Sequence, residues 1–195
     1  MSVHRYSVVA LLFLLTACAS SYTLVSDGSV TVGDLRIQAG PGWNQAPKFE
    51  IPWARRSTQT WTRDGMPLDR LIIIPRLFDG ESIFFPDEDI EYPVFKANMT
   101  PEQIQALVIT SLELAQGPNP AVVNTDNLRP YRFGNESGVL FDFGVIVHDG
   151  PEYAGTAGAF VANERLYLLY FVAAVPYYFD KHIGAAEAVI RSARL

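Results

Sequence analysis

The pattern of apolar and polar residues alternates with a period of two in short blocks that cover much of the chain. Such a period is typical of strands with one buried face. The blocks predict strands at residues 22–25, 29–38, 58–62, 124–133, 138–147 and 153–162. Two further strands are predicted at residues 68–77, which are rich in Leu and Ile, and at residues 166–175, which are apolar on both faces. Turn-forming pairs separate several neighbouring blocks: Asp27-Gly28, Asp64-Gly65, Asp149-Gly150 and Asn163-Glu164. Because short turns join antiparallel strands, the sheet is expected to be mainly antiparallel.

Two other segments repeat apolar residues at helical spacing. The first opens with a capping box, in which the side chain of Thr100 can accept a hydrogen bond from the backbone amide of Gln103 and the side chain of Gln103 can accept one from the backbone amide of Thr100. Its apolar face carries Ile104, Leu107, Val108, Leu112 and Ala115. The second runs over residues 177–194 and turns Phe179, Ile183, Ala186, Val189 and Ile190 inward. Both segments are therefore predicted to be amphipathic helices. The proline-containing residues 40–56 and the acidic residues 79–98 are expected to be irregular.

These elements predict an α+β fold, in which two long amphipathic helices cover a mainly antiparallel sheet. A length of 195 residues suits one domain. We expect the domain to span residues 22–195, after a signal peptide at residues 1–17 and a short tether at residues 18–21.

The amino-terminal segment has the three parts of a secretory signal. His4 and Arg5 are followed by an apolar stretch over residues 6–15 and then by the small residues Thr16 and Ala17. A helix of about ten residues rises about 15 Å, roughly half the thickness of a hydrocarbon core, so it is too short to remain as a membrane span. We therefore expect this segment to be removed.

The residues Leu15-Thr16-Ala17-Cys18 resemble the lipobox of bacterial lipoproteins. The resemblance implies that the Cys18 thiol carries a diacylglycerol, that the chain is cut before Cys18, and that the new amino group is acylated. Two or more acyl chains hold a protein stably on a membrane. In the enterobacterial family an Asp after the cysteine retains the protein in the inner membrane. Because Ala19 stands there, the periplasmic face of the outer membrane is the expected location.

Part of the mature chain resembles the Mog1/PsbP-like α-β-α sandwich. The resemblance rests on Pro41-Gly42-Trp43 and on the stretch from Trp61 through Asp64-Gly65 to Leu71. This sandwich occurs in photosystem assembly proteins, a Ran-binding protein and many bacterial lipoproteins. It implies a binding or assembly role without catalysis, although a fold alone does not decide a function.

Composition narrows the range of partners. A net charge of −6 and a pI near 5.0 would repel a phosphate backbone, and the basic residues are scattered, so nucleic acid is not an expected partner. Cys18 is the single cysteine. An internal disulfide and a Cys-x-x-Cys zinc site are therefore excluded.

No group of residues has a familiar catalytic or metal-binding spacing. His148 and Asp149 could form a base with an orienting carboxylate, but adjacent residues of a strand point to opposite faces. Ser137 lacks the spacing of a nucleophile elbow. The carboxylates from Asp79 to Glu91 do not follow the order of a calcium loop. We therefore predict no enzymatic activity, no metal, and no cofactor beyond the covalent lipid.

Aromatic residues gather in two places and are the candidates for a ligand or partner surface: Trp43, Trp53, Trp61, Tyr177 and Tyr178. The leading prediction is a membrane-anchored, non-catalytic lipoprotein that binds an envelope protein or supports assembly. The alternative is a carrier for a lipid or another small hydrophobic ligand, and an envelope hydrolase is third. A concave aromatic pocket would favour the carrier, whereas a flat apolar patch would favour the partner binder.

Overall fold

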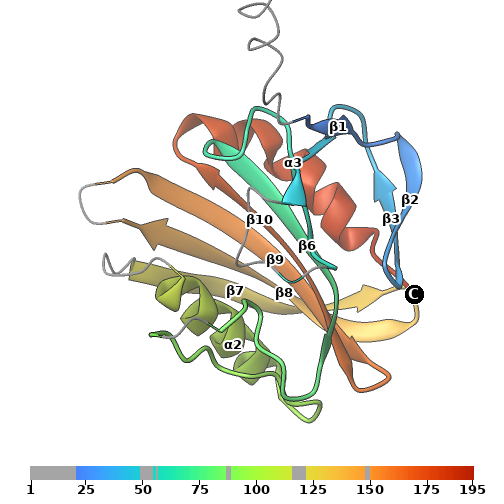
Figure 1. Ribbon diagram of the computed structural model, residues 1–195, viewed down its shortest axis with the longest axis vertical. Helices are drawn as coiled ribbons and strands as arrows, with labels where there is room; N and C mark the ends of the chain where they lie inside the picture. Colours follow the sequence, from blue (N-terminus) through green and yellow to red (C-terminus); the bar gives the residue numbers. More distant parts are fainter. Residues whose placement is uncertain (1–20, 49–54, 56, 87–88, 116–121, 148–149) are drawn as a thin grey trace, which may run out of the picture.

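The computed structural model describes residues 21–48, 55, 57–86, 89–115, 122–147 and 150–195 (Figure 1). No helix within these ranges is long and apolar enough to cross a membrane. The predicted signal peptide with Cys18, the Trp53 side chain and the His148-Asp149 pair lie outside the described residues.

Eight strands of the described chain form one antiparallel sheet in the order β1-β4-β5-β6-β10-β9-β8-β7 (Figure 1). Their bounds are β1 (Thr23–Leu24), β4 (Asn44–Gln45), β5 (Gln59–Thr62), β6 (Asp69–Phe78), β7 (Val122–Phe133), β8 (Glu136–Ile146), β9 (Glu152–Ala162) and β10 (Arg165–Ala174). Strands β7 to β10 form a meander, and β10 then pairs with β6. The antiparallel sheet predicted from the alternating pattern is therefore confirmed.

The turn between β9 and β10 shows how local sequence sets this meander. Asn163 and Glu164 have φ angles of 49° and 59°. Two successive residues with positive φ are what a two-residue type I′ hairpin needs, and its twist matches that of the flanking strands. The predicted turn therefore lies where it was expected and sets the register of Arg165 opposite Ala162.

Each described helix packs on a different face of the sheet (Figure 1). Helix α2 (Pro101–Leu114) begins with the predicted capping box at Thr100 and Gln103, and it contacts β7 and β8. Helix α3 (Tyr177–Arg191) contacts β10, β9 and β6. Both predicted helices are therefore present.

Alternation along the strands divides the interior into two cores. On β6, Leu71 and Ile73 belong to the core under α3, whereas Ile72 and Ile74 belong to the core on the α2 side. Side chains of β10 divide in the same way, which explains why this strand reads as apolar on both faces. The sheet is thus a middle layer between two separate apolar layers.

Two expectations about the first part of the chain were wrong. Residues 29–38 do not form one strand but belong to a separate hairpin of β2 (Gly28–Val32) and β3 (Leu35–Ala39), which reverses after Gly33 at a φ of 58°. Residues 40–56 are not wholly irregular, because they contain β4, which pairs with both β1 and β5. An alternating pattern continues across a tight turn, so it does not reveal where the chain reverses.

The expectation that two long helices cover the sheet holds only in part. The helices have 14 and 15 residues, and strands dominate the described chain. The β2-β3 hairpin shares the cover of one face with α3. Ile83, Phe84, Tyr92 and Phe95 share the cover of the other face with α2. Because the sheet is wider than one helix, α2 leaves the face of β5, β6 and β10 without a helix over it.

Candidate ligand-binding site

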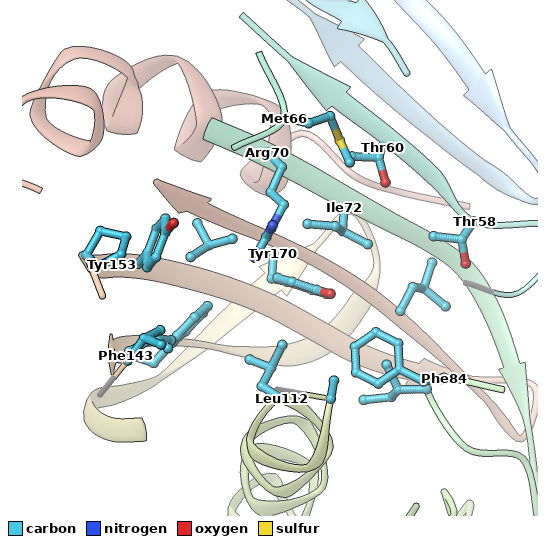
Figure 2. A pocket seen from close by; sticks show the side chains of 17 residues that line it. Thr58, Thr60, Met66, Arg70, Ile72, Phe84, Leu112, Phe143, Tyr153 and Tyr170 are labelled. Carbon is cyan, nitrogen blue, oxygen red and sulfur yellow. The ribbon is translucent and has the colours of Figure 1, made fainter. Parts of the chain in front are cut away.

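A cavity of about 420 Å³ lies on the α2 side of the sheet, beside the part of the sheet on which α2 packs. Its lining includes Ile72 of β6 and Tyr170 of β10 (Figure 2). Ile74 and Val172 of the same two strands also line it. These residues alternate along their strands and therefore share one face. The volume is within the range of small-molecule sites.

The walls of this cavity, which we call the α2-side pocket, come from several separate parts of the chain. Leu112 extends from the last turn of α2, Phe84 from the segment after β6, and Phe143 and Tyr153 from β8 and β9 (Figure 2). Met66 lies at the side nearest the β5-β6 turn. The lining is mostly apolar and aromatic, which is typical of sites for small hydrophobic molecules.

Polar groups in the pocket are few and have no partners among the described residues. The hydroxyl oxygens of Thr58 and Thr60 are covered and form no hydrogen bond there. Burial raises the pKa of Tyr170 to about 12, against the opposing effect of the nearby Arg70. Tyr170 therefore keeps its proton near neutral pH and retains a hydroxyl that can donate a hydrogen bond.

A second cluster of titratable groups ties α3 to the β5-β6 turn. His182 has a side chain 5% exposed, and its Nε2 lies 2.7 Å from Asp64 Oδ2. Lys181 Nζ donates to the same oxygen over 2.6 Å. The hydrogen bond from Lys181, followed by that from His182, holds the pKa of Asp64 below its usual value. Because an ionised carboxylate only accepts, Nε2 of His182 is the donor to Asp64, and Nδ1 of the same ring is buried without a partner among the described residues.

Ligand atoms of Asp64, Asp69 and His182 lie within 4.8 Å of one another, which raises the question of a metal site. Both oxygens of Asp69 already accept hydrogen bonds from the β5-β6 turn, including one from the Thr62 hydroxyl. The ammonium of Lys181 occupies the oxygen of Asp64 that would face a metal ion. A cation would have to displace that ammonium, so the arrangement fits a structural tie better than a metal site.

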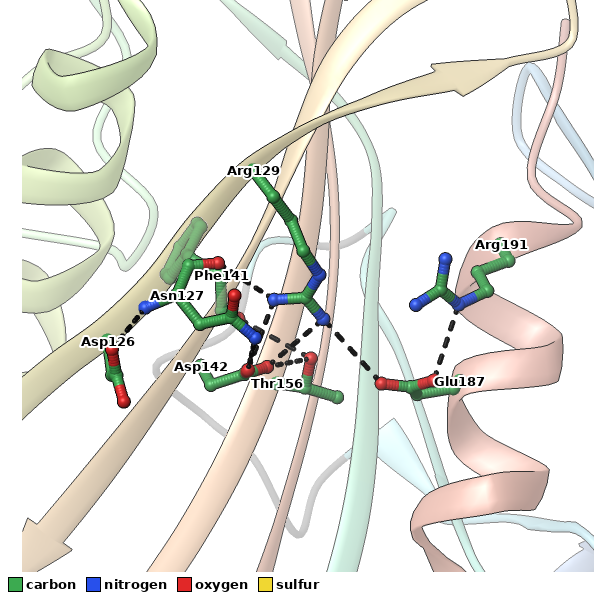
Figure 3. Close-up of polar contacts among 8 residues, drawn as sticks. All are labelled: Asp126, Asn127, Arg129, Phe141, Asp142, Thr156, Glu187 and Arg191. Atoms are coloured by element: carbon green, nitrogen blue, oxygen red, sulfur yellow. Dashed lines mark hydrogen bonds and ion pairs between the residues drawn. The ribbon is translucent and has the colours of Figure 1, made fainter.

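A third polar cluster joins β7, β8 and β9 to α3 (Figure 3). Arg129 contacts Asp142 Oδ2 over 3.1 Å and Glu187 Oε1 over 3.7 Å, and Glu187 also pairs with Arg191 over 3.3 Å. Thr156 donates to Asp142 Oδ1 over 2.8 Å. Two basic and two acidic groups neutralise one another here. The cluster therefore fastens α3 to the sheet and leaves no charge for a ligand.

Two further hollows, of about 460 and 430 Å³, are more open to solvent than the α2-side pocket. One lies where the amino-terminal turn of α2 meets β7 and β8, and includes Met99 and Leu128. The other borders the Arg129 cluster and is lined by charged groups such as Asp142 and Glu187. Volume alone does not distinguish the three hollows, but enclosure by apolar side chains favours the α2-side pocket.

The tryptophans proposed as a ligand or partner surface lie elsewhere. Trp43 and Trp61 are 0% exposed and belong to the core under α3, so that part of the prediction was wrong. Their large apolar area explains the burial, because each ring fills space between the sheet and the elements above it. Tyr177 is 61% exposed and Tyr178 is half-buried. Both are on α3, and their rings pack edge to face with 5.2 Å between the ring centroids. Among the candidates that the structure describes, these two tyrosines remain available for a surface, whereas Trp53 lies outside the described residues.

Sequence reasoning missed the residues that line the α2-side pocket. Arg70 and Tyr170 lie within strands whose pattern predicted a buried sheet and nothing more specific. The one available signal was Arg70 itself, a charged residue directly before the run Leu71–Ile74. The pairing of Asp64 with His182 also spans residues far apart in the chain, so no spacing could have indicated it.

No protein-family model matches the chain, and no curated protein matches its sequence. Among solved structures, the chain is similar to cyanobacterial PsbP (CyanoP) from Synechocystis, with a TM-score of 0.56 and 13% sequence identity. The match covers 92% of this chain and 95% of CyanoP. The fold is PsbP-like. This confirms the fold suggested by Pro41-Gly42-Trp43 and the Trp61–Leu71 stretch, and at this level of identity it concerns the fold alone.

Proposed function

We propose that the protein is a lipid-anchored envelope lipoprotein whose folded part binds a small hydrophobic ligand in the α2-side pocket. The observation that carries this proposal is the cavity of about 420 Å³ with apolar walls over β5, β6 and β10. A carrier needs such a concave site, whereas a protein-binding surface is generally flat. The carrier therefore takes precedence over the partner-binding role that composition and resemblance favoured.

The anchor is proposed from the lipobox, Leu15-Thr16-Ala17-Cys18. Attachment through diacylglycerol and an amino-terminal acyl chain would hold the pocket beside the membrane, where hydrophobic molecules are concentrated. We propose the periplasmic face of the outer membrane as the location.

The anchor is tested by expressing the precursor and a Cys18→Ser variant in a Gram-negative host. Membrane fractionation and intact mass should give a mature, acylated chain that begins at Cys18 and is found in membranes. The variant should lose both the lipid and the membrane attachment. An unlipidated soluble product from the unaltered precursor would refute the anchor.

Ligand binding is tested with the apolar fluorophore N-phenylnaphthylamine. We expect the full chain, held in amphipol and corrected for amphipol alone, to bind it saturably. Leu112→Trp should abolish most of this binding, because the larger side chain enters the pocket. Leu114→Trp is the matched control, since Leu114 is on the same helix, 36% exposed and outside the pocket lining.

Circular dichroism of both tryptophan variants would establish that they are folded. If folded Leu112→Trp bound the fluorophore as well as Leu114→Trp did, the α2-side pocket would not be the binding site. An absence of saturable binding by the unaltered protein would remove the carrier function itself.

A protein partner is the second candidate, favoured by Tyr177 and Tyr178. Exposed tyrosines are enriched among residues that dominate binding energy at protein interfaces. Lys181 lies over the Tyr177 ring at 5.5 Å, which restrains the ring at the surface. A photocrosslinking residue placed at position 177 should yield one discrete adduct in cells if this surface meets a partner. If the crosslinker at position 177 gave only a diffuse set of products, no more abundant than those from a crosslinker at another exposed position, this surface would not be a partner site.

A further inference from the structure

Arg70 is the single charged side chain among the described residues that line the α2-side pocket. It is half-buried on β6 and shares its face with Ile72 and Ile74. Figure 2 shows its side chain extending over the sheet toward Tyr170, between Met66 and the pocket floor. The guanidinium is therefore presented to the cavity by the regular alternation of the strand.

Arg70 forms no ion pair with the described residues, and it is the one arginine among them that lines this apolar pocket. Other arginines of the described chain that lie near a carboxylate pair with it. Arg55 pairs with Glu81, Arg76 with Asp34, and Arg129 with Asp142 and Glu187. No carboxylate appears among the described residues of the pocket lining. The positive charge in this apolar cavity is thus not neutralised by the described part of the protein.

A partly desolvated cation beside apolar walls is costly unless an anion accompanies it. The planar guanidinium offers two parallel N–H donors, which match the two oxygens of a carboxylate. Tyr170, which keeps its proton, adds a hydroxyl donor on the floor of the same cavity. The remaining lining, including Ile72, Phe84 and Leu112, would contact an aliphatic chain.

We propose that the pocket binds an amphiphilic monocarboxylate, such as a fatty acid, with its head group on Arg70 and its chain along the apolar lining. This rests on the proposed ligand-binding function and adds the class of ligand. The carboxylate accepts two N–H bonds from Arg70, and the tail displaces water from the walls contributed by α2 and β8. No covalent step is involved.

The proposal is tested by isothermal titration calorimetry of the full chain in amphipol at neutral pH, with octanoate and octanol as matched probes. Both have the same chain, but only octanoate carries a negative head group. Charge-assisted hydrogen bonds predict that octanoate binds about 10- to 100-fold more tightly than octanol. Arg70→Gln should remove this preference, so that octanoate and octanol bind the variant about equally well. Arg76→Gln, on the same strand but outside the pocket lining, should keep the preference.

The outcomes distinguish the two proposals. If octanol and octanoate bind the unaltered protein equally well, or if Arg70→Gln keeps the preference, the role of Arg70 is refuted while the carrier function stands. If neither probe binds, and N-phenylnaphthylamine does not bind either, the carrier function fails together with the ligand class. Measuring octanol binding to Arg70→Gln also shows that this variant is folded, because a misfolded protein would lose both probes.

Discussion

Thr60 and Thr62 offer a sensitive test of the packing around the pocket, because they are the same residue type on one short strand in opposite situations. Both are buried on β5, with 3% and 2% of their surface exposed. The Thr60 hydroxyl oxygen is covered and has no hydrogen-bond partner among the described residues. The Thr62 hydroxyl instead donates to Asp69 Oδ1 over 3.0 Å and accepts from the Gly65 amide over 2.8 Å.

Replacement by valine keeps the shape of threonine and removes the hydroxyl. A buried hydroxyl without a partner costs about 1–3 kcal/mol, so Thr60→Val should stabilise the ligand-free protein by about 1–2 kcal/mol. In a protein of this size that change raises Tm by about 2–8 °C. Thr62→Val should instead destabilise by about 2–3 kcal/mol, because it removes a hydrogen bond to a buried carboxylate.

The assay is urea denaturation of the two variants and the unaltered protein, followed by tryptophan fluorescence, since Trp43 and Trp61 are both fully buried. Equal m-values would show that the same surface is exposed on unfolding. A Thr60→Val variant less stable than the unaltered protein by about 1 kcal/mol or more would mean that its hydroxyl has a partner, and would refute the reasoning. A neutral Thr62→Val would show that the Asp69 turn contributes little.

Two more predictions concern the other face of the sheet. Gly158→Ala should lower the free energy of unfolding by about 1–3 kcal/mol in urea denaturation, because the added Cβ would lie 2.5 Å from Ile190 Cγ2. Gly144→Ala is the control and should be nearly neutral, because the nearest atom to its added Cβ is 3.9 Å away. Equal effects would contradict this packing of α3. Asp64→Asn should cost on the order of 1 kcal/mol above pH 3.8, the ordinary Asp value, and progressively less as the pH falls below it. The sign follows from the lowered pKa of Asp64, since the Lys181 contact stabilises only the ionised carboxylate, so a difference independent of acid pH would disprove it.

Local sequence determined most of the individual elements. The capping box at Thr100 and Gln103 set the start of α2, and the pair Asn163-Glu164 set the turn into β10. These features depend on contacts within a few residues, so the sequence predicts them without knowledge of the rest of the chain. The PsbP-like fold was indicated by the resemblance of Pro41-Gly42-Trp43 and the Trp61–Leu71 stretch to a known family, and the similarity to CyanoP agrees with it.

Strand pairing and the division of the two faces needed the tertiary structure. Alternation indicates that a residue faces one side of a sheet but not which side, and it passes unbroken through the β2-β3 turn at Gly33. Trp43 and Trp61 therefore read equally well as surface or core, and their burial under α3 became clear only from the packing of that helix.

The α2-side pocket is likewise a consequence of tertiary structure. It exists because α2 packs on β7 and β8 and leaves another part of the sheet without a helix over it, and because α2, β6, β8 and β10 then enclose the same space. The sequence by itself supplied the resemblance to a lipobox at Cys18, the amphipathic helices and the alternating strands, all of which depend on neighbouring residues. Long-range packing placed Arg70 in an apolar cavity whose described lining carries no carboxylate, and no local pattern around Arg70 could indicate that.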